Sequence, residues 1–460
     1  MTHRKCSQCL IHICLLSAVT LTLAVPASAE WKEKVLYSFQ GGANDGSVPA
    51  GGVVFDPQGN LYGATTDGGP ASCKPIGGAC GTVFQLTPPA QKGGSWTETL
   101  IYQFQGKDSN DASVPNGGLI RDATGNLYGV TAYGGTGDCV LLGVKAGCGA
   151  VYELSPPKQK GGAWTKTILY SFPTAKQGYF PNGDLVFDSA RNLYGATTFG
   201  GGKGTTCDKF YGGQCGAVFK LSPPITKGGK WTENVLHKFA GGTDGANPNG
   251  GLVLDSKGAV YGTTFGGGNE SGECGTAGCG TVFKLVPPSA KGEPWTMKIL
   301  DRFNGQDGAT PAAGVIFDQK GNLYGTAFAG GNQGNGGVFE LAKPESGFHT
   351  WKEKMLYFFD GGNDGDNPMA RLIFGPNGDL YGAAYAAQTE SGTVFRLTPT
   401  GRNGGWNFIV LYGFKGPPDG ALPAAGLVSD GIGNLYGTTQ KGGTGAACQF
   451  GCGTVFELSP

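Results

Sequence analysis

The chain has 460 residues, of which 87 are Gly and 27 are Pro, so these two types make up about a quarter of it. That share approaches the range of low-complexity disorder, but 7 Trp, 17 Tyr and 26 Phe are too many for a chain that buries no core. The 34 basic and 34 acidic residues leave no net charge, which disfavours nucleic acid as a partner because nucleic-acid-binding surfaces usually carry a basic excess.

The first segment has the features of a secretory signal peptide. Arg4 and Lys5 give it a basic start, residues 11–25 are mostly apolar, and Ala27-Ser28-Ala29 supplies small residues for cleavage. The apolar run is shorter than the roughly 20 residues that a membrane-spanning helix needs. We therefore expect residues 1–29 to be a signal peptide cut near Ala29. Residues 30–460 would then form one domain in an extracellular or periplasmic compartment, with no transmembrane segment.

Internal repeats account for the rest of the chain. All seven Trp lie eight residues before a Phe, and a G-x-V-[FY] element also occurs seven times. A Tyr-Gly pair preceded by Leu or Val recurs at intervals of 55 to 67 residues, at Tyr62, Tyr128, Tyr194, Tyr261, Tyr324, Tyr381 and Tyr436. The mature chain is therefore predicted to consist of seven repeats.

Each repeat contains four short strand-like runs. In the second repeat they cover residues 118–121, 127–131, 150–154 and 167–172. A tight hairpin turn at residues 122–126 joins the first two, and Pro156-Pro157 keeps the loop before the fourth out of any strand. Four antiparallel strands repeated seven times predict an all-β fold, a seven-bladed β-propeller of four-stranded antiparallel blades.

The order of elements at the two ends predicts how the ring closes. The mature chain opens on a run of the fourth type, which ends at Phe39, and it finishes on a run of the third type at residues 454–458. We therefore expect the N-terminal strand, residues 35–39, to pair with residues 454–458 and to complete the last blade. Such closure removes the exposed sheet edges that invite aggregation.

Ten Cys remain after the signal peptide, and they fall in pairs within the loops between the second and third strands. An even number in a secreted chain indicates disulfides. The alternative is zinc, which needs four ligands around one ion, whereas these pairs belong to separate repeats. We predict five local disulfides and no metal site, with the pairs Cys73–Cys80, Cys139–Cys148, Cys207–Cys215, Cys274–Cys279 and Cys448–Cys452.

Loops of a propeller sort onto two faces, and one face receives the long, Cys-bearing loops. Binding sites tend to lie on variable loops held by a rigid scaffold, so we place the site on this face and at the channel mouth. The residue that ends the second strand is aromatic in five repeats and could stack on sugars or other planar ligands, or simply pack against the next blade. The candidates are Tyr133, Phe199, Phe265, Phe328 and Tyr385.

Repeats five and six lack the Cys pair and are shorter than the others. Their loops are expected to leave a notch in the rim at which a ligand approaches, although plain loop variation is the alternative. The notch residues are Asn332, Gln333, Asn335, Gln388 and Glu390. Asp-Gly turns, as at Asp45, could bind calcium, but one carboxylate per blade falls well short of the six to eight oxygens needed.

The consensus G-N-L-Y-G-T-T-x-x-G-G, followed by G-T-V-F-x-L, Trp, L-Y-x-F and D-G, resembles the GloVer-type tandem repeat of secreted bacterial proteins. The resemblance covers essentially all of residues 31–460. It implies an exported protein built of β-propeller-like repeats. The family has no assigned activity, so the resemblance implies no reaction.

These observations favour a secreted, disulfide-stabilised binding or interaction module for glycans or other cell-envelope components. We expect a monomer with no cofactor and no catalytic residue; the partner would be an extracellular glycan or a protein. One alternative is a carbohydrate-active enzyme, a glycosidase or lyase, that uses loop carboxylates at the channel mouth. The other is a structural surface protein that binds no small ligand.

Overall fold

The computed structural model describes residues 30–49, 51–69, 78, 80–141, 144–202, 207, 214–226, 228–269, 273–386, 391–401 and 404–460. Trp31–Pro460 form one compact unit. The predicted signal peptide lies outside the described residues. Among the residues that are described, none belongs to a helix with the length and hydrophobicity required to cross a bilayer.

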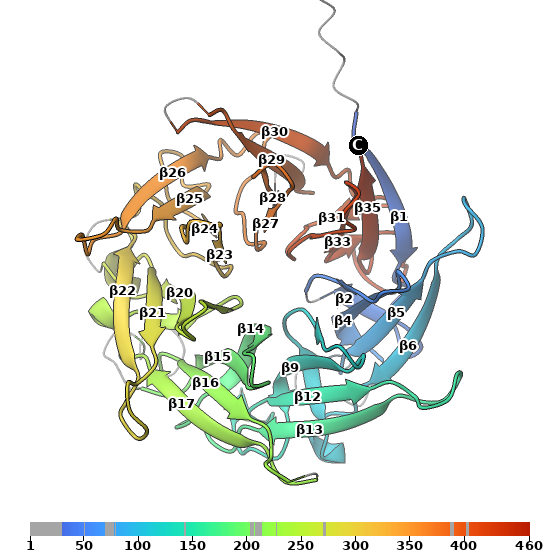
Figure 1. The fold of residues 1–460 in the computed structure, drawn as a ribbon. Coiled ribbons are helices and arrows are strands. Elements are labelled where there is room, and N and C mark those ends of the chain that lie inside the picture. Colours follow the sequence, from blue (N-terminus) through green and yellow to red (C-terminus); the bar gives the residue numbers. More distant parts are fainter. Residues whose placement is uncertain are drawn as a thin grey trace, which may run out of the picture. The chain divides into compact units, whose positions relative to one another are not determined.

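Seven antiparallel sheets stand side by side around a central opening, so the chain is a seven-bladed β-propeller, as predicted (Figure 1). We number the blades 1 to 7 in chain order. In each blade the strand nearest the axis comes first and the strand at the rim comes fourth. The described segments also contain three single turns of 3₁₀ helix, η1 (Lys107–Ser109), η2 (Gly242–Asp244) and η3 (Gly275–Ala277).

The first four blades contain the following strands. Blade 1 has β2 (Gly46–Pro49), β3 (Val54–Phe55), β4 (Leu61–Gly68), β5 (Thr82–Thr87) and β6 (Thr97–Gln103). Blade 2 has β7 (Ala112–Pro115), β8 (Ile120–Arg121), β9 (Leu127–Gly134), β12 (Ala150–Ser155) and β13 (Thr165–Ser171), with the hairpin β10 (Val140–Leu141) and β11 (Val144–Lys145) in its loop. Blade 3 has β14 (Tyr179–Phe187), β15 (Leu193–Phe199), β16 (Ala217–Ser222) and β17 (Thr232–Lys238). Blade 4 has β18 (Ala246–Pro248), β19 (Val253–Leu254), β20 (Val260–Gly266), β21 (Thr281–Val286) and β22 (Thr296–Arg302).

The last three blades follow the same order. Blade 5 has β23 (Ile316–Phe317), β24 (Leu323–Ala327), β25 (Gly337–Ala342) and β26 (Lys352–Phe358). Blade 6 has β27 (Ile373–Phe374), β28 (Leu380–Ala384), β29 (Thr393–Pro399) and β30 (Trp406–Gly413). Blade 7 has β32 (Val428–Ser429), β33 (Leu435–Thr439), β35 (Thr454–Ser459) and β1 (Lys32–Ser38), with the pair β31 (Gly420–Ala421) and β34 (Lys441–Gly442) beside them.

The innermost strand differs from its prediction because it is split in most blades. In blade 2 the predicted run of residues 118–121 is only β8, and β7 begins six residues earlier. At the end of β7, Val114 has a φ of 58° and Pro115 follows. Pro cannot donate to a sheet ladder, so a segment that ends on Pro has no clear strand signal, and the four predicted runs do not include it.

The ring closes as predicted. β1 pairs antiparallel with β35, with Lys32 opposite Ser459 and Ser38 opposite Thr454. The Phe39 N–H then donates to the Gly453 carbonyl at 3.0 Å. In Figure 1 the N-terminal strand accordingly lies beside the last strand of the chain.

The repeated Trp and the Tyr of Tyr-Gly meet where neighbouring blades touch. The Trp164 ring of blade 2 lies 5.8 Å from the Tyr62 ring of blade 1, and the Trp31 ring of blade 7 lies 6.4 Å from the Tyr381 ring of blade 6. Each is a tilted or edge-to-face contact, which stabilises aromatic pairs beyond the area they bury. The Trp residues therefore belong to the blade interfaces.

The two repeated Phe positions also meet across the blade interfaces. Phe172 of blade 2 packs edge-on against Phe219 of blade 3 with ring centroids 5.2 Å apart, and both are fully buried. A Cβ on Gly195 would lie 2.5 Å from the Phe219 ring, so the Gly of this Tyr-Gly pair provides room for the ring. The same pairing recurs at the other six interfaces, with Tyr152 in place of Phe in blade 2.

Acidic side chains gather at the interface between blades 4 and 5. Burial, with Asp307 and Asp301 as neighbours, raises the pKa of Glu353 to about 8, and burial beside Asp307 raises the pKa of Asp301 to about 6. The Glu353 Oε1 atom is buried without a hydrogen-bond partner among the described residues. At the corresponding place between blades 1 and 2, Lys166 Nζ instead pairs with Asp111 at 2.5 Å.

These shifts predict that the protein loses stability as the solution becomes alkaline. The folded-state pKa of Glu353 lies above its ordinary value of 4.5, so its protonated form stabilises the fold fully below pH 4.5, and that contribution is lost as pH rises through about 8. We expect Glu353→Gln to unfold like the wild type at pH 4.5 and to be about 1–2 kcal/mol more stable at pH 8.5, less than the full shift implies because the group is partly solvated. Urea unfolding at both pH values measures the stability difference between the variant and the wild type. The same difference at pH 4.5 and at pH 8.5 would contradict the prediction.

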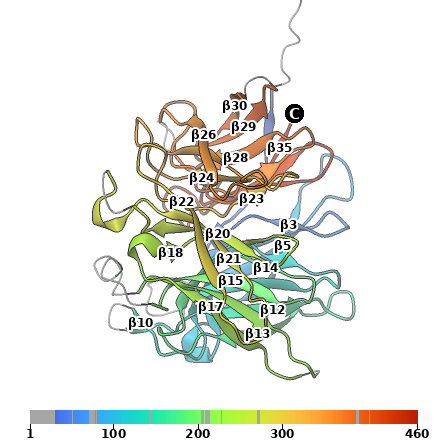
Figure 2. The same cartoon turned by 60° about the vertical axis from the view of Figure 1, so that its left-hand side comes forward.

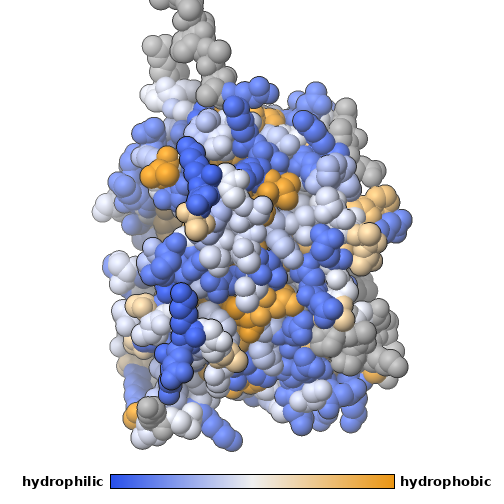
Figure 3. Space-filling model, turned by 90° about the vertical axis from the view of Figure 1, so that its right-hand side faces the viewer, coloured by the Kyte–Doolittle hydropathy of each residue, from blue (hydrophilic) through white to orange (hydrophobic). Residues whose placement is uncertain are grey.

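The two ends of the ring carry different loops. In the turned view of Figure 2, β10 and β18 lie toward one end and β3 toward the other. We call the first end the disulfide face, because the loops between second and third strands emerge there. The rim seen in Figure 3 is mainly hydrophilic, with small separate hydrophobic patches.

Candidate functional site

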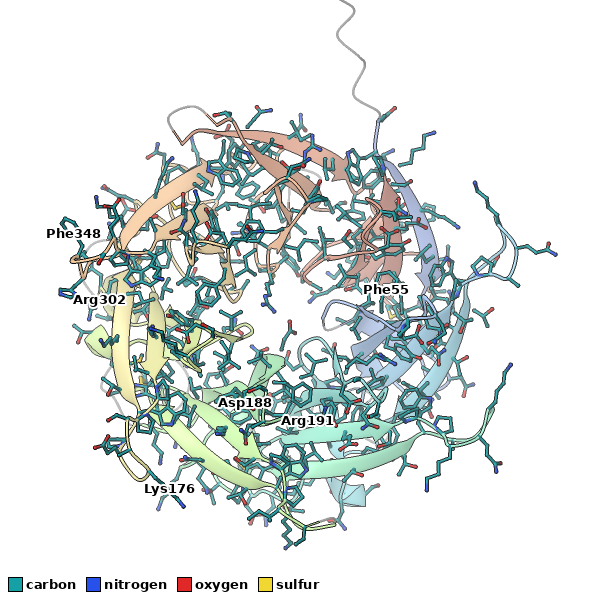
Figure 4. All side chains as sticks on the ribbon, in the orientation of Figure 1. Phe55, Lys176, Asp188, Arg191, Arg302 and Phe348 are labelled. Atoms are coloured by element: carbon teal, nitrogen blue, oxygen red, sulfur yellow. A yellow bond between two sulfur atoms is a disulfide. The ribbon has the colours of Figure 1, made fainter. Side chains whose placement is uncertain are left out.

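A cavity of about 610 Å³ occupies the axis of the propeller and receives residues from every blade. Figure 4 shows the side chains concentrated within and between the blades, with few of them reaching into the central opening. The volume lies in the range of small-molecule sites in proteins. The axial cavity is therefore the first candidate for a binding site.

Gly and Ala account for 13 of the 31 residues that line the cavity, 12 are larger apolar residues and six are polar. A Pro-x-[GA]-x-[LV] segment brings each innermost strand to the axis, and neighbouring segments touch through their backbones. A Cβ on Gly117 would lie 2.5 Å from the Gly183 carbonyl oxygen, and a Cβ on Gly314 would lie 2.0 Å from the Gly251 oxygen. Where neighbouring segments touch, the wall therefore presents peptide groups, and the six polar side chains determine its hydrogen-bonding chemistry.

Two blades place a charged side chain where the other five have Gly. The fourth position of the segment is Asp184 in blade 3 and Arg371 in blade 6. Asp184 Oδ1 accepts a hydrogen bond from the Gly118 N–H at 2.7 Å, and Arg371 Nη1 lies 3.9 Å from Asp184 Oδ2. About a third of each side chain is exposed, at 36% and 34% respectively. Oppositely charged groups from distant blades thus meet inside the cavity.

Three carboxamides line the cavity beside this pair. Asn116, Asn182 and Asn249 occupy the second position of the segment in blades 2, 3 and 4, and Asn182 Nδ2 donates to Asn249 Oδ1. Carboxamides both donate and accept hydrogen bonds. Ala312 and Ala424 occupy the same position in blades 5 and 7, and Met369 occupies it in blade 6. At this position of the segment, blades 2 to 4 therefore present carboxamides and blades 5 to 7 present apolar side chains.

The residue before the Pro of this segment has a positive φ in every blade, between 50° and 59°. We call these seven residues the collar: Val48, Val114, Phe180, Asn247, Thr310, Asn367 and Leu422. Each donates its N–H to a carbonyl of the preceding blade at 2.7 to 3.2 Å. In five cases the acceptor is a Cys of the disulfide loop, and in the other two it is Asn335 or Ser391. This strained conformation recurs in all seven blades, so it serves to join them.

The structure brings two of the predicted aromatic residues together at the collar. Tyr133 packs edge-on against the collar residue Phe180 of the next blade at 5.2 Å, and Phe180 lies 5.5 Å from Phe199. Phe199 also lies 5.4 Å from Tyr179. All four rings are partly exposed, so packing against the next blade and an accessible edge coexist.

The other three aromatic candidates, Phe265, Phe328 and Tyr385, lie at the second strands of blades 4, 5 and 6. Tyr385 Oη lies 3.4 Å from Oε1 of Gln440, and Gln440 itself lines the axial cavity. This contact links the collar side to the cavity. Phe265 is the next-to-last residue of β20, Phe328 directly follows β24, and both are also half-buried. Their role in binding stays a prediction.

Three of the five predicted notch residues are among the described residues. Gln388 and Glu390 lie outside the described residues. Asn332 and Gln333 are exposed, whereas Asn335 is half-buried and supplies the carbonyl that binds the collar residue Asn367.

Four of the five predicted disulfides are present, namely Cys139–Cys148, Cys207–Cys215, Cys274–Cys279 and Cys448–Cys452. Cys80 is disulfide-bonded as well, and its predicted partner Cys73 lies outside the described residues. Since five of these Cys residues also bind the collar through their carbonyls, the disulfides hold the loops next to the channel mouth.

The Asp-Gly turns are engaged in local hydrogen bonds. Asp419 Oδ2 accepts from the Tyr412 hydroxyl at 2.9 Å and from the Lys415 N–H at 3.0 Å, and Asp45 is bonded in the same way to Tyr37 and Gln40. Among the described residues, no group of three or more His, Cys, Asp or Glu side chains is arranged to hold a metal ion.

Asp184 and Arg371 were missed in the sequence, although a signal for them was present. Aligning the seven Pro-x-[GA]-x-[LV] segments shows Gly at the fourth position in five repeats and opposite charges in the other two. This contrast stands out only after the segments are known to face a common axis, because a single Asp or Arg beside Gly resembles an ordinary turn.

Comparisons with known proteins identify a family. The Gloeobacter/Verrucomicrobia repeat model matches residues 24–276 and 269–460. A search of curated proteins finds no match. Among solved structures, the PQQ-bound aldose sugar dehydrogenase from Streptomyces coelicolor is similar at 14% identity and a TM-score of 0.41, covering 94% of this chain and 99% of that one.

Two further solved structures are similar at comparable levels. A putative oxidoreductase (glucose dehydrogenase) from Thermus thermophilus has 17% identity and a TM-score of 0.44, covering 74% of this chain and 95% of that one. PhoX from Pseudomonas fluorescens, in complex with vanadate, has 10% identity and a TM-score of 0.45, covering 94% of this chain and 95% of that one.

Proposed function

The chain belongs to the Gloeobacter/Verrucomicrobia repeat family, and we propose that it acts outside the cytoplasm as a module that binds a glycan at the disulfide-face mouth of its axial cavity. The disulfides fit an oxidising compartment, whether extracellular or periplasmic. We propose, as part of this function, that residues 1–29 are a signal peptide.

The observation that carries the proposal is the combination of six polar side chains in the cavity with an aromatic mouth. Saccharides present hydroxyl groups along their edges and apolar C–H faces on their rings. The Asn, Asp and Arg side chains of the cavity can bind the hydroxyls, and the rings of Tyr133, Phe199 and Tyr385 offer faces and edges for the C–H groups. Both sets belong to one closed ring of blades, and binding that needs no rearrangement of such a ring favours affinity.

A glycan array probed with the purified mature protein tests this function, with reducing-sugar release measured on the same glycans. We expect binding without release. Release of reducing sugar would instead support the alternative of a glycosidase or lyase that uses loop carboxylates. Absence of both binding and release would overturn the proposal and favour a protein partner or a structural surface role.

The aromatic mouth makes a specific prediction about affinity. We expect Tyr133→Ala and Tyr385→Ala each to weaken binding of the best array glycan about three- to tenfold, corresponding to the roughly 0.5–1.5 kcal/mol of one aromatic contact. Isothermal titration calorimetry measures the affinity. Phe348→Ala is the matched control, because Phe348 is 70% exposed and lies at the outer rim in Figure 4. Unchanged affinity in both Tyr variants would remove these residues from the site.

A further inference from the structure

The pair Asp184 and Arg371 is the feature of the cavity that the repeat architecture does not require. Five blades fold with Gly at this position, and glycine suffices for the close backbone contacts around the axis. Both side chains line the cavity, one from each of two blades that are not neighbours. The fold does not need these two side chains, so we look for their role in the ligand that the cavity binds.

The pair is weakly joined and only partly satisfied. At 3.9 Å, Arg371 Nη1 and Asp184 Oδ2 are too far apart for a hydrogen bond, and a third of each side chain reaches solvent. Asp184 Oδ1 is engaged by the Gly118 N–H, whereas Oδ2 has no hydrogen-bond donor in the described part of the chain. The Arg371 guanidinium, with five N–H groups, likewise makes no hydrogen bond to a described residue. A ligand can therefore bind both groups without breaking a strong interaction.

Charge decides which ligand suits this arrangement. An anionic ligand that engaged Arg371 would bring its charge beside the Asp184 carboxylate, which disfavours it. A neutral hydroxyl group can donate to Asp184 Oδ2 while a neighbouring hydroxyl accepts from Arg371, which leaves the pair electrically balanced. The flanking Asn116, Asn182 and Asn249 add uncharged donors and acceptors. We propose that Asp184 and Arg371 are specificity-determining residues that make the axial cavity select a neutral, hydroxyl-rich saccharide over an acidic one.

This inference rests on the proposed glycan-binding function and adds the class of glycan. It makes a directional prediction, because each charge can be removed separately. Asp184→Asn leaves Arg371 uncompensated and keeps an Oδ1 acceptor for the Gly118 N–H. Arg371→Gln leaves Asp184 uncompensated. The first variant is expected to gain affinity for saccharides with carboxylates, and the second is expected to reject them further.

The test is a glycan array printed with matched neutral and uronic-acid oligosaccharides of equal length, probed with wild type and both variants. We expect wild type to prefer the neutral members, and we expect Asp184→Asn to raise the acidic-to-neutral binding ratio at least fivefold, with Arg371→Gln moving it in the opposite direction. Glu345→Gln, which removes an exposed carboxylate from the loop between the third and fourth strands of blade 5, is the charge control and should leave the ratio unchanged.

Each outcome separates this inference from the proposed function. Binding that favours acidic members in wild type, or a ratio that neither substitution moves, would overturn the inference while the glycan-binding function stood. Absence of all binding would overturn both. The double variant Asp184→Gly with Arg371→Gly restores the residue of the other five blades, so it should fold, and thermal unfolding checks this. Loss of the neutral preference in that variant supports the inference, whereas an unchanged preference would contradict it.

Discussion

Removal of residues 31–39 is expected to abolish the cooperative unfolding transition or to lower Tm by more than about 10 °C. β1 supplies the fourth strand of blade 7, and without it β35 becomes an exposed sheet edge. Phe39, which is fully buried, also provides the edge-on partner of Phe84 in blade 1 at 5.1 Å. The deletion therefore opens the blade and the interface beside it. Differential scanning calorimetry and far-UV circular dichroism measure the loss.

A permuted chain provides the control for this deletion. The same nine residues can be placed after Pro460 through a linker copied from residues 156–163, which join the third and fourth strands of blade 2. Lys32 faces Ser459 in the antiparallel pair, so the transferred strand would start beside the end of β35. We expect the permuted protein to recover most of the lost stability. A deletion variant that keeps the wild-type Tm would show that β1 does not close the ring.

Phe219→Ala is expected to lower the free energy of unfolding by about 3–5 kcal/mol, the usual loss for a fully buried aromatic residue. The Phe219 ring packs against Phe172 and lies over Gly195, so its removal leaves a cavity between two blades. Gly195 cannot fill that space, and the neighbouring strand is held in register by its ladder. Urea unfolding with a constant m-value would measure the difference.

Tyr152→Phe is the matched control, because Tyr152 is the one residue other than Phe at the seven equivalent positions. Tyr152 occupies the place of Phe219 in blade 2 and is buried, and burial raises the pKa of its hydroxyl, so the group stays neutral. Tyr152→Phe introduces the residue found in the other six blades and should change stability by less than about 1.5 kcal/mol. Similar losses for Phe219→Ala and Tyr152→Phe would show that the interface aromatic pairs do not dominate the core.

Much of the fold could be predicted because it is repeated seven times. The strand count, the blade number and the closure by residues 35–39 followed from the order of the repeated elements, and the pairing of β1 with β35 confirms the closure. What the signature residues contact was not evident. Trp164 meets Tyr62 and Phe172 meets Phe219 across blade interfaces, and such contacts depend on how blades turn against each other rather than on spacing.

The candidate site was harder to predict than the fold. The choice of the disulfide face and the aromatic positions came from strand direction, and Tyr133 and Phe199 do lie together at the collar. The cavity chemistry was missed, because a single Asp or Arg beside Gly resembles an ordinary turn until the seven Pro-x-[GA]-x-[LV] segments are known to face one axis. The collar was missed as well, since a positive φ at Val48 or Leu422 has no sequence signal. These features arise from seven blades meeting at one axis, and no single repeat contains them.

A crystal structure of the protein with its best array glycan would test the central claim most directly. We predict a saccharide inside the axial cavity, with hydroxyl groups within about 3.2 Å of Asp184 Oδ2 and of the Arg371 guanidinium, and with a ring against Tyr385 or Tyr133. A glycan bound at the outer rim, or on the face opposite the disulfides with the axial cavity unaltered, would contradict it.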